Sequence, residues 1–122
     1  MIEHKHLIVK GKYLKSMTKE RIKHFINDLI FLLDMKLMEL PNNPNIGYVD
    51  GVGSGHTGVA IITTSHIVIH CWAETNDYQL DIYSCKKFDP STIIAYCRDS
   101  GLSKQSARFF DRNYDLITDE DI

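Results

Sequence analysis

The chain has 122 residues, 43% of them hydrophobic, and its 14 Lys and Arg nearly balance its 16 Asp and Glu, for a net charge of −2. This length and composition predict one domain with a substantial core and exclude a disordered or fibrous protein. The charge balance argues against a nucleic-acid-binding surface, which carries a marked excess of Lys and Arg.

No apolar run approaches the roughly 18 residues of a membrane span, and the first residues do not resemble a signal peptide. We therefore expect no membrane partner. The cysteines are an odd number in a chain without an export signal, so they predict reduced thiols in the cytoplasm rather than a disulfide framework; they are Cys71, Cys85 and Cys97. A domain of this size is also expected to be too small to form a deep active site alone.

The N-terminal part of the chain predicts a strand followed by a long helix. Residues 5–13 have a β-branched centre, which is typical of a strand. Thr18 is a suitable helix N-cap, and apolar residues then recur at spacings of three and four over about residues 19–38. The prolines of segment 41–44 are expected to stop this amphipathic helix.

The rest of the chain predicts an antiparallel sheet and a second helix. Short β-branched runs predict strands at residues 59–64, 66–72 and 78–84. Asp89 and Pro90 form a helix start, and Gly101 is expected to end that helix after about Asp99. A last strand is expected near residues 107–110. The order of elements predicts an α+β fold, a two-layer sandwich with two helices packed on one face of an antiparallel sheet, in a single domain over residues 1–122.

Four glycines precede the first strand of the middle group, and three of them match a dinucleotide-binding pattern. The pattern G-x-G-x-x-G is formed by Gly53, Gly55 and Gly58. It requires a helix that opens at the last glycine and holds pyrophosphate at its N-terminus, whereas a strand is predicted here. We therefore interpret the match as accidental. The glycines indicate either a flexible turn or a loop in which the backbone approaches a ligand closely.

The densest group of reactive side chains lies between Thr63 and Glu74. On a regular strand, His66 and His70 share a polar and aromatic face with Trp72, and the apolar residues between them form a buried face. Histidines four residues apart on a strand are separated by roughly 13 Å, which is too far to share a metal ion unaided. We predict no metal site.

Several residues of this region form a specific combination: Ser65-His66, His70-x-Trp72-x-Glu74, Asp81-x-x-x-Cys85 and Asp89-Pro90. The combination resembles the prokaryotic S-adenosylmethionine decarboxylase family, small pyruvoyl-dependent enzymes of polyamine (spermidine) biosynthesis. The resemblance covers about residues 57–112 well, including Gly58 and a closing Asp111-Arg112, and fits the first strand and long helix in outline.

The resemblance implies a self-processing proenzyme that is cut between Thr64 and Ser65. The Ser65 hydroxyl would attack the Thr64 carbonyl, and elimination and hydrolysis would leave a pyruvoyl cofactor at the start of an α chain, residues 65–122. Residues 1–64 would remain as the β chain. The pyruvoyl group would form a Schiff base with the α-amine of S-adenosylmethionine, an electron sink for decarboxylation. The family also implies a homodimer with active sites at the subunit interface.

The resemblance assigns roles to four further side chains. His70 matches the histidine that acts as a base in processing, which suits a group that titrates near neutrality. Thr57 falls where the family has a processing serine. Cys85 matches the thiol that reprotonates the substrate, and Glu74 matches the carboxylate that binds the ribose hydroxyls. Ser65 and His70 would face opposite sides of an unbroken strand, so we expect a tight hairpin that turns at Ser65.

The sequence departs from the family where the substrate is expected to bind. Thr64 replaces the usual Glu before the processing serine, and residues 45–51 replace an aromatic, proline-containing segment that helps to hold adenine. Tyr48 could stack on adenine in its stead, whereas Asp50 could favour a basic amino acid. Two alternatives therefore stay open: a pyruvoyl decarboxylase of arginine or ornithine, and an uncleaved, non-catalytic homologue that binds a ligand or a partner.

Overall fold

The structure is a computed structural model that describes residues 2–121, except the side chain of Lys104. The described elements follow in the order β1 (Lys5–Tyr13), α1 (Lys19–Leu32), β2 (Asn45–Val49), β3 (Gly55–Ile62), β4 (Ser65–Trp72), β5 (Asp77–Ser84), α2 (Pro90–Asp99) and β6 (Leu102–Asp111). The predicted caps are confirmed: the Thr18 hydroxyl accepts the Arg21 amide at the start of α1, and the Asp89 carboxylate accepts the Ser91 amide at the start of α2.

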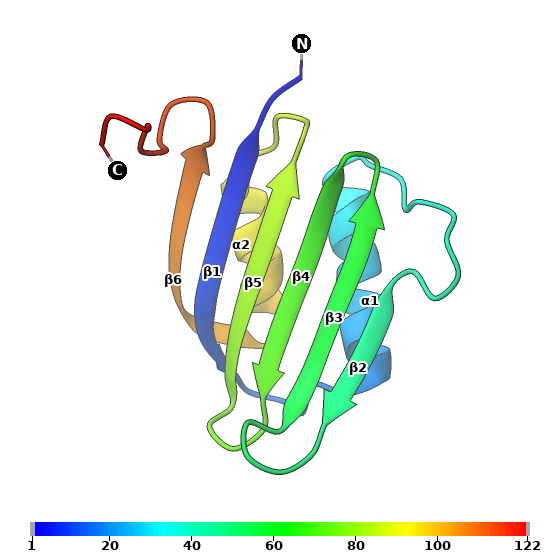
Figure 1. Cartoon of the computed structure of the whole chain (residues 1–122). Helices are drawn as coiled ribbons and strands as arrows, with labels where there is room; N and C mark the ends of the chain where they lie inside the picture. The colour runs from blue at the N-terminus through cyan, green and yellow to red at the C-terminus, as the bar shows by residue number, and fades with distance from the viewer. Residues whose placement is uncertain (1, 122) are drawn as a thin grey trace.

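The strands form one antiparallel sheet in the order β2-β3-β4-β5-β1-β6. Both described helices lie against the same side of the sheet (Figure 1). We call this side the helix face and the opposite side the open face. This arrangement confirms the predicted two-layer α+β sandwich, which forms because each amphipathic helix must bury its apolar stripe against another layer.

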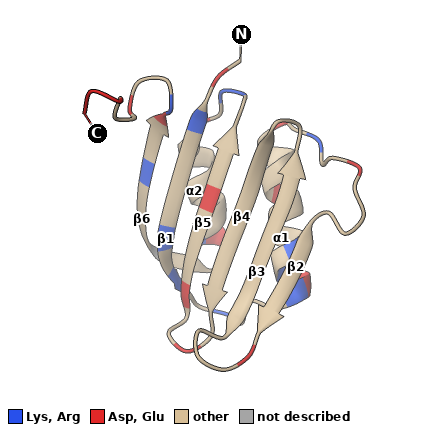
Figure 2. Cartoon of the chain, viewed as in Figure 1, with Lys and Arg blue, Asp and Glu red and all other residues tan. Residues whose placement is uncertain are grey.

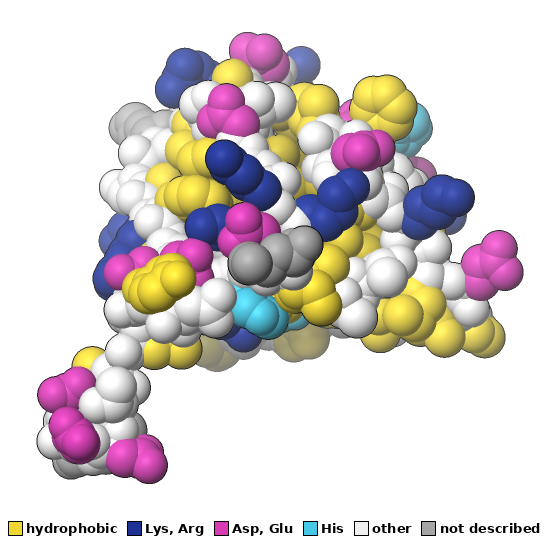
Figure 3. All heavy atoms as spheres, turned by 90° about the horizontal axis from the view of Figure 1, so that it is seen from above, with side chains coloured by type: hydrophobic (Ala, Val, Ile, Leu, Met, Phe, Trp, Pro, Cys, Tyr) yellow, Lys and Arg dark blue, Asp and Glu magenta, His cyan; other side chains and the backbone are white. Residues whose placement is uncertain are grey.

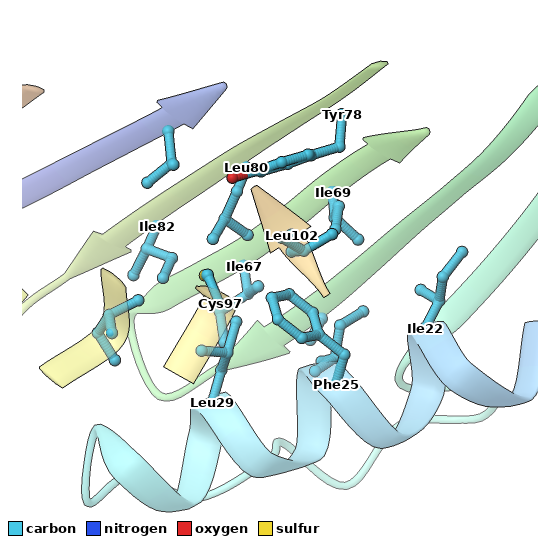
Figure 4. Close-up of a cluster of buried hydrophobic side chains, with 14 of the residues drawn as sticks. Ile22, Phe25, Leu29, Ile67, Ile69, Tyr78, Leu80, Ile82, Cys97 and Leu102 are labelled. Atoms are coloured by element: carbon cyan, nitrogen blue, oxygen red, sulfur yellow. The ribbon is translucent and has the colours of Figure 1, made fainter. Parts of the chain in front are cut away.

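The core fills the space between α1, α2 and the helix face of the sheet (Figure 4). Side chains of α1 at spacings of three and four meet alternate side chains of the central strands, as the two periodicities require. The buried set includes Ile22, Phe25, Ile26 and Leu29 of α1, Ile67 and Ile69 of β4, and Tyr78, Leu80 and Ile82 of β5.

Helix α1 is shorter than predicted, because it ends at Leu32 and not near residue 38. The amide of Leu33 closes the last turn on the Leu29 carbonyl, and Asp34 then takes a φ of 54°, which no helix accommodates. Met35 and Leu37 still pack against the core from an irregular segment. The apolar spacing beyond Leu32 therefore predicts correctly that these side chains pack against the core, whereas the predicted extension of the helix is wrong.

The two edge strands were the least visible in the sequence. Strand β2 was not predicted at all, and β6 begins at Leu102, well before the predicted residues 107–110. In β2 the single buried residue is Ile46, so the strand lacks the alternation that marks a half-buried strand. An edge strand pairs on one side only, and its pattern is correspondingly weak.

Gly58 lies inside β3, and no helix follows it, so the dinucleotide-binding pattern is accidental, as predicted. A Cβ at this position would lie 2.7 Å from Cγ2 of Ile22 and 2.9 Å from Cδ1 of Ile26. The glycine therefore allows α1 to approach the sheet closely. Gly51 and Gly53 adopt positive φ in the turn between β2 and β3, which fits the interpretation of these glycines as a turn.

Charge is distributed unevenly over the sheet. Strands β2, β3 and β4 contain no Lys, Arg, Asp or Glu, whereas β1 carries only lysines, β5 only aspartates and β6 residues of both signs (Figure 2). The acidic segment after β6 stands away from the body of the molecule (Figure 3). Neither described helix has the length and apolar character that crossing a membrane requires.

Candidate functional site

The peptide between Thr64 and Ser65 lies at the tip of the β3–β4 hairpin. Ile62 and Ser65 pair with each other, so only Thr63 and Thr64 form the turn. The expected tight hairpin is present, but the predicted turn at Ser65 is wrong, because Ser65 is already the first residue of an unbroken β4. Thr64 has a φ of 50°, in the left-handed region that β-branched residues rarely adopt. Holding such a residue there costs of order 1–3 kcal/mol.

Ser65 and Cys85 are in contact at this end of the sheet. The Cys85 amide donates to Oγ of Ser65 at 2.9 Å, and the Cys85 thiol donates to the Thr63 carbonyl at 3.4 Å. Ser65 is 7% exposed on the helix face, whereas Cys85 is half-buried in the loop after β5. The structure therefore brings together the predicted nucleophile, the predicted scissile peptide and the predicted proton donor.

The loop that carries Cys85 is held by its neighbour Ser84. The buried Ser84 hydroxyl accepts the Lys86 amide at 3.0 Å and lies 2.8 Å from the Lys86 carbonyl. The Lys86 ammonium in turn donates to the carbonyl oxygen of Asp34 at 2.7 Å. These bonds fix the backbone on both sides of the thiol. The sequence analysis did not single out Ser84, although it directly precedes the predicted cysteine.

The three thiols differ in their acidity. The Ser65 hydroxyl, and after it the Thr64 hydroxyl, lies beside the sulfur of Cys85 and lowers the pKa of that thiol. Burial raises the pKa of Cys71 and of Cys97 to about 12. Cys85 is therefore the thiol with an environment suited to proton transfer, and the other two behave as small core residues.

Thr57 and His70 form a second pair on the open face. They are register partners on β3 and β4, and Thr57 Oγ1 lies 2.9 Å from His70 Nδ1. The His70 ring also lies next to Trp72, with ring centroids 5.9 Å apart. The two residues that were predicted to assist processing are thus hydrogen-bonded to each other.

The two pairs lie far apart within one chain. Ser65 and His70 are five positions apart on β4, which corresponds to about 17 Å along the strand. Alternate residues of β4 are buried, so Ser65 belongs to the helix face and His70 to the open face. We call the Ser65–Cys85 pair the nucleophile end of β4 and the Thr57–His70 pair the base end.

The predicted substrate-binding residues lie nearer the base end. Glu74 is exposed in the turn between β4 and β5, beyond Trp72. Tyr48 is 54% exposed on β2, where its ring lies 4.8 Å from that of His56 and its hydroxyl donates to the Asp50 carboxylate at 3.3 Å. Strand register places Tyr48 on the face of the sheet opposite to Thr57. The structure therefore does not bring Tyr48 onto the same face as the Thr57–His70 pair.

Sequence reasoning missed a polar network on the open face beside the nucleophile end. It joins His6, Asp81 and Arg112 to His66, the residue that follows Ser65. His66 and Asp81 were part of the quoted residue combination, which was the available signal. Within residues 2–121, no three His, Cys, Asp or Glu side chains gather closely enough to hold a metal ion.

Comparison with known proteins gives a consistent result. The family model for S-adenosylmethionine decarboxylase matches residues 6–112. A proenzyme of that name from Clostridium botulinum strain Hall is 42% identical over 52 residues, which cover 42% of this chain and 45% of the relative. The same proenzyme from strain Loch Maree is 40% identical over 53 residues, covering 43% and 46%. The matched segment therefore spans less than half the length of these relatives.

One solved structure has the same fold over nearly the whole chain. The adenosylmethionine decarboxylase from Aquifex aeolicus superposes with a TM-score of 0.67 at 18% identity, and the match covers 97% of this chain and 95% of that one. At this level of identity the likeness concerns the arrangement of helices and strands.

Proposed function

Because this chain belongs to the S-adenosylmethionine decarboxylase family, we propose that it is a self-processing, pyruvoyl-dependent decarboxylase of S-adenosylmethionine that supplies an aminopropyl donor for polyamine synthesis. The observation that carries this proposal is the meeting of Ser65, Cys85 and a strained Thr64–Ser65 peptide at the tip of one hairpin. These contacts support the proposal, because the chemistry requires a hydroxyl, the peptide to be cut and a thiol close together.

The processing step uses only groups of the chain and water. The Ser65 Oγ attacks the Thr64 carbonyl carbon, the Thr64–Ser65 C–N bond breaks, and an ester forms. Loss of the Ser65 α-proton then breaks the Cβ–O bond, which releases the Thr64 carboxylate. The dehydroalanine left at residue 65 tautomerises to an imine, which water hydrolyses to a pyruvoyl group with release of ammonia. The products are a β chain of residues 1–64 and an α chain of residues 65–122, cut from one domain.

The separation of the two ends of β4 supports a homodimer. A base at His70 cannot reach Ser65 about 17 Å away in the same chain. In a symmetric dimer, each subunit contributes the same surface, so the nucleophile end of one protomer can meet the base end of its partner. The open face, which carries His70, offers a partner uncharged strands and partly exposed apolar side chains, among them Ile8, Val59 and Ile61.

Once formed, the pyruvoyl group would supply a carbonyl that accepts the electron pair left by carbon dioxide. Cys85 is already next to residue 65 and would hold the proton that returns to the α-carbon of the substrate. Glu74 would accept hydrogen bonds from the ribose hydroxyls, and Tyr48 offers an exposed ring for adenine. We place the reaction in the cytoplasm, where reducing conditions keep Cys85 a thiol.

Denaturing mass spectrometry of the purified chain tests processing. We expect two fragments, residues 1–64 and a pyruvoyl-blocked 65–122, and a single intact chain for Ser65→Ala. Release of labelled carbon dioxide from S-adenosylmethionine, compared with arginine and ornithine, then tests the substrate. A wild-type chain that remains wholly intact would overturn the enzymatic proposal and favour a binding homologue; release from a basic amino acid alone would overturn the substrate.

The Cys85→Ala variant separates the two chemical roles. Because the thiol is assigned to substrate reprotonation, cleavage is expected to proceed, while turnover falls by roughly 10²–10⁴-fold, as for the loss of a general acid. The measurement compares the fraction cleaved with kcat on the same sample. Cys97→Ala, which removes a buried thiol of the core, is the matched control for loss of a sulfur. Normal turnover in Cys85→Ala would refute the assigned proton donor.

A further inference from the structure

The polar network beside the nucleophile end connects three strands of the open face with Arg112, the residue after β6. Asp81 Oδ1 lies 2.7 Å from Nε2 of His6 and 3.1 Å from Nε2 of His66. On the other side of His6, the Nε and Nη2 atoms of Arg112 lie 3.1 and 2.9 Å from Nδ1. The network therefore runs from the residue after β6, through β1 and β5, to the second residue of β4.

The donors and acceptors of this network follow from its end groups. A guanidinium only donates hydrogen bonds, so Nδ1 of His6 accepts and its proton lies on Nε2, which donates to Asp81. A carboxylate only accepts, so Nε2 of His66 also donates to Asp81. Each imidazole ring is therefore held in one orientation by its hydrogen bond to Asp81.

The surroundings hold the network in place. His6 is 8% exposed, and its ring is stacked on Phe110 with centroids 4.9 Å apart. The guanidinium of Arg112 lies 4.3 Å from the centre of the Tyr83 ring, and Tyr83 pairs with both His6 and His66 across the sheet. The carboxylate that reaches His66 is therefore backed by buried and stacked groups on neighbouring strands.

Cleavage changes what is required of His66. In the intact chain the β3–β4 hairpin ties residue 65 covalently to β3. After cleavage, residue 65 becomes a chain end, and chain ends fray unless other contacts hold them. A reactive group displaced by about 1 Å can lose roughly 100-fold in rate. His66 is covalently linked to residue 65, and its side chain reaches Asp81 of β5, which belongs to the same α chain.

We propose that the Arg112–His6–Asp81–His66 network anchors the new N-terminus of the α chain and so positions the group at residue 65 against Cys85. This inference rests on the proposed function, because it requires a cut chain. Asp81, His6 and Arg112 act through His66 and are positioning residues. The hairpin holds residue 65 before cleavage, and the network holds it after cleavage.

The Asp81→Ala variant tests the anchor. We expect the chain to be cleaved to the same extent as the wild type, because the hairpin still holds Ser65 at that stage. After cleavage, kcat is expected to fall by roughly 10- to 100-fold with little change in KM. Amide hydrogen exchange is expected to rise at residues 66–68 of the cleaved protein. In a Ser65→Ala background, which stays intact, Asp81→Ala is expected to leave that exchange unchanged.

Two further variants provide the controls. Lys5→Met removes an ion pair with Asp111 at the same end of the sheet (2.8 Å) but on the helix face, and it is expected to leave turnover unchanged. Asp81→Asn keeps one acceptor oxygen, so its kcat should lie between those of the wild type and Asp81→Ala. If Asp81→Ala does not fold, Asp81→Asn and Arg112→Met must each lower kcat and raise amide exchange at residues 66–68 in the cleaved form.

These experiments distinguish a failure of the anchor from a failure of the proposed function. A wild-type chain that is not cleaved refutes processing itself. A wild type that is cleaved and active, with Asp81 variants of equal kcat, overturns the anchor alone. Exchange that rises equally in intact and cleaved protein would also overturn it, since Asp81 would then only stabilise the sheet.

Discussion

The two ends of β4 are built in different ways. The nucleophile end lies at a turn, where Thr64 is held at a positive φ. Ser65 and Thr63 both form hydrogen bonds with Cys85. The base end lies within paired strands, where Thr57 and His70 meet across a regular ladder. The first end holds strain next to the peptide that we propose is cut, and the second is a pair of side chains on regularly paired strands.

Neither end of β4 contains, within one chain, all the groups that the proposed processing requires. Alternation along β4 places the two ends on opposite faces, and Ser65 and His70 lie five positions apart along the strand. A small domain with a single sheet has no second wall to close this distance. The open face, with its uncharged strands β2, β3 and β4, is the surface on which a second copy would supply it.

The largest effect is expected from combining defects in the two ends. Ser65→Ala and His70→Ala are each expected to stay uncut when expressed alone. When the two are co-expressed, a mixed dimer would place an intact Ser65 against the partner's intact His70. Random pairing puts roughly half of the His70→Ala chains into such dimers, and these should be cleaved. Mass spectrometry of differently tagged chains gives the fraction.

Two results would contradict this prediction of cleavage in mixed dimers. Cleavage of His70→Ala alone would show that His70 is not required as a base. An absence of cleavage in a mixture that forms mixed dimers, as shown by tag pull-down, would place both ends of the site in a single chain.

A smaller effect is expected from relieving the strain at Thr64. Glycine adopts positive φ at no steric cost, so Thr64→Gly should stabilise the uncut chain relative to the ester and slow cleavage about tenfold. Thr64→Val keeps the β-branched carbon and loses the hydroxyl, so it should cleave at close to the wild-type rate. The half-time of cleavage after refolding, followed on denaturing gels, is the measurement. A slow Val variant would show that the hydroxyl matters rather than the strain.

The smallest effect is a shift in the acidity of Cys85. The Ser65 hydroxyl lowers the pKa of this thiol, so its removal is expected to raise that pKa. His70→Ala and the double variant with Ser65→Ala are both expected to be intact and differ only in this hydroxyl. Alkylation by iodoacetamide should therefore reach half its maximal rate at lower pH in His70→Ala. Cys71 and Cys97, with pKa values of about 12, should remain unreacted and serve as internal controls.

An identical midpoint in the two proteins would show that the Ser65 hydroxyl does not interact with the thiolate. The predicted direction also has a consequence for the proposed reaction, because processing consumes that hydroxyl. Loss of the Ser65 hydroxyl would leave Cys85 a weaker acid that is more fully protonated near neutral pH.

Much of the fold was readable from local pattern. Thr18 and the Asp89-Pro90 pair predicted two helix starts that the structure confirms, since capping depends on residues adjacent in sequence. The alternation in 66–72 predicted a buried face and a polar face of β4, because side chains alternate along any strand. The extension of α1 to residue 38 was wrong, because apolar spacing reports burial and does not distinguish a helix from an irregular segment that packs on the core.

The family resemblance, the α+β class and a tight hairpin next to Ser65 could all be predicted from the sequence alone, because they depend on residue types and their local spacing. Which of the candidate site residues contact one another depends on the tertiary structure. The contact of Ser65 with Cys85, 20 residues away, follows from the pairing of β4 with β5, and the reach of Arg112 to His6 and Asp81 follows from β1 lying between β5 and β6. Strand order is set by how the whole sheet buries one face against two helices, and no local pattern encodes that choice.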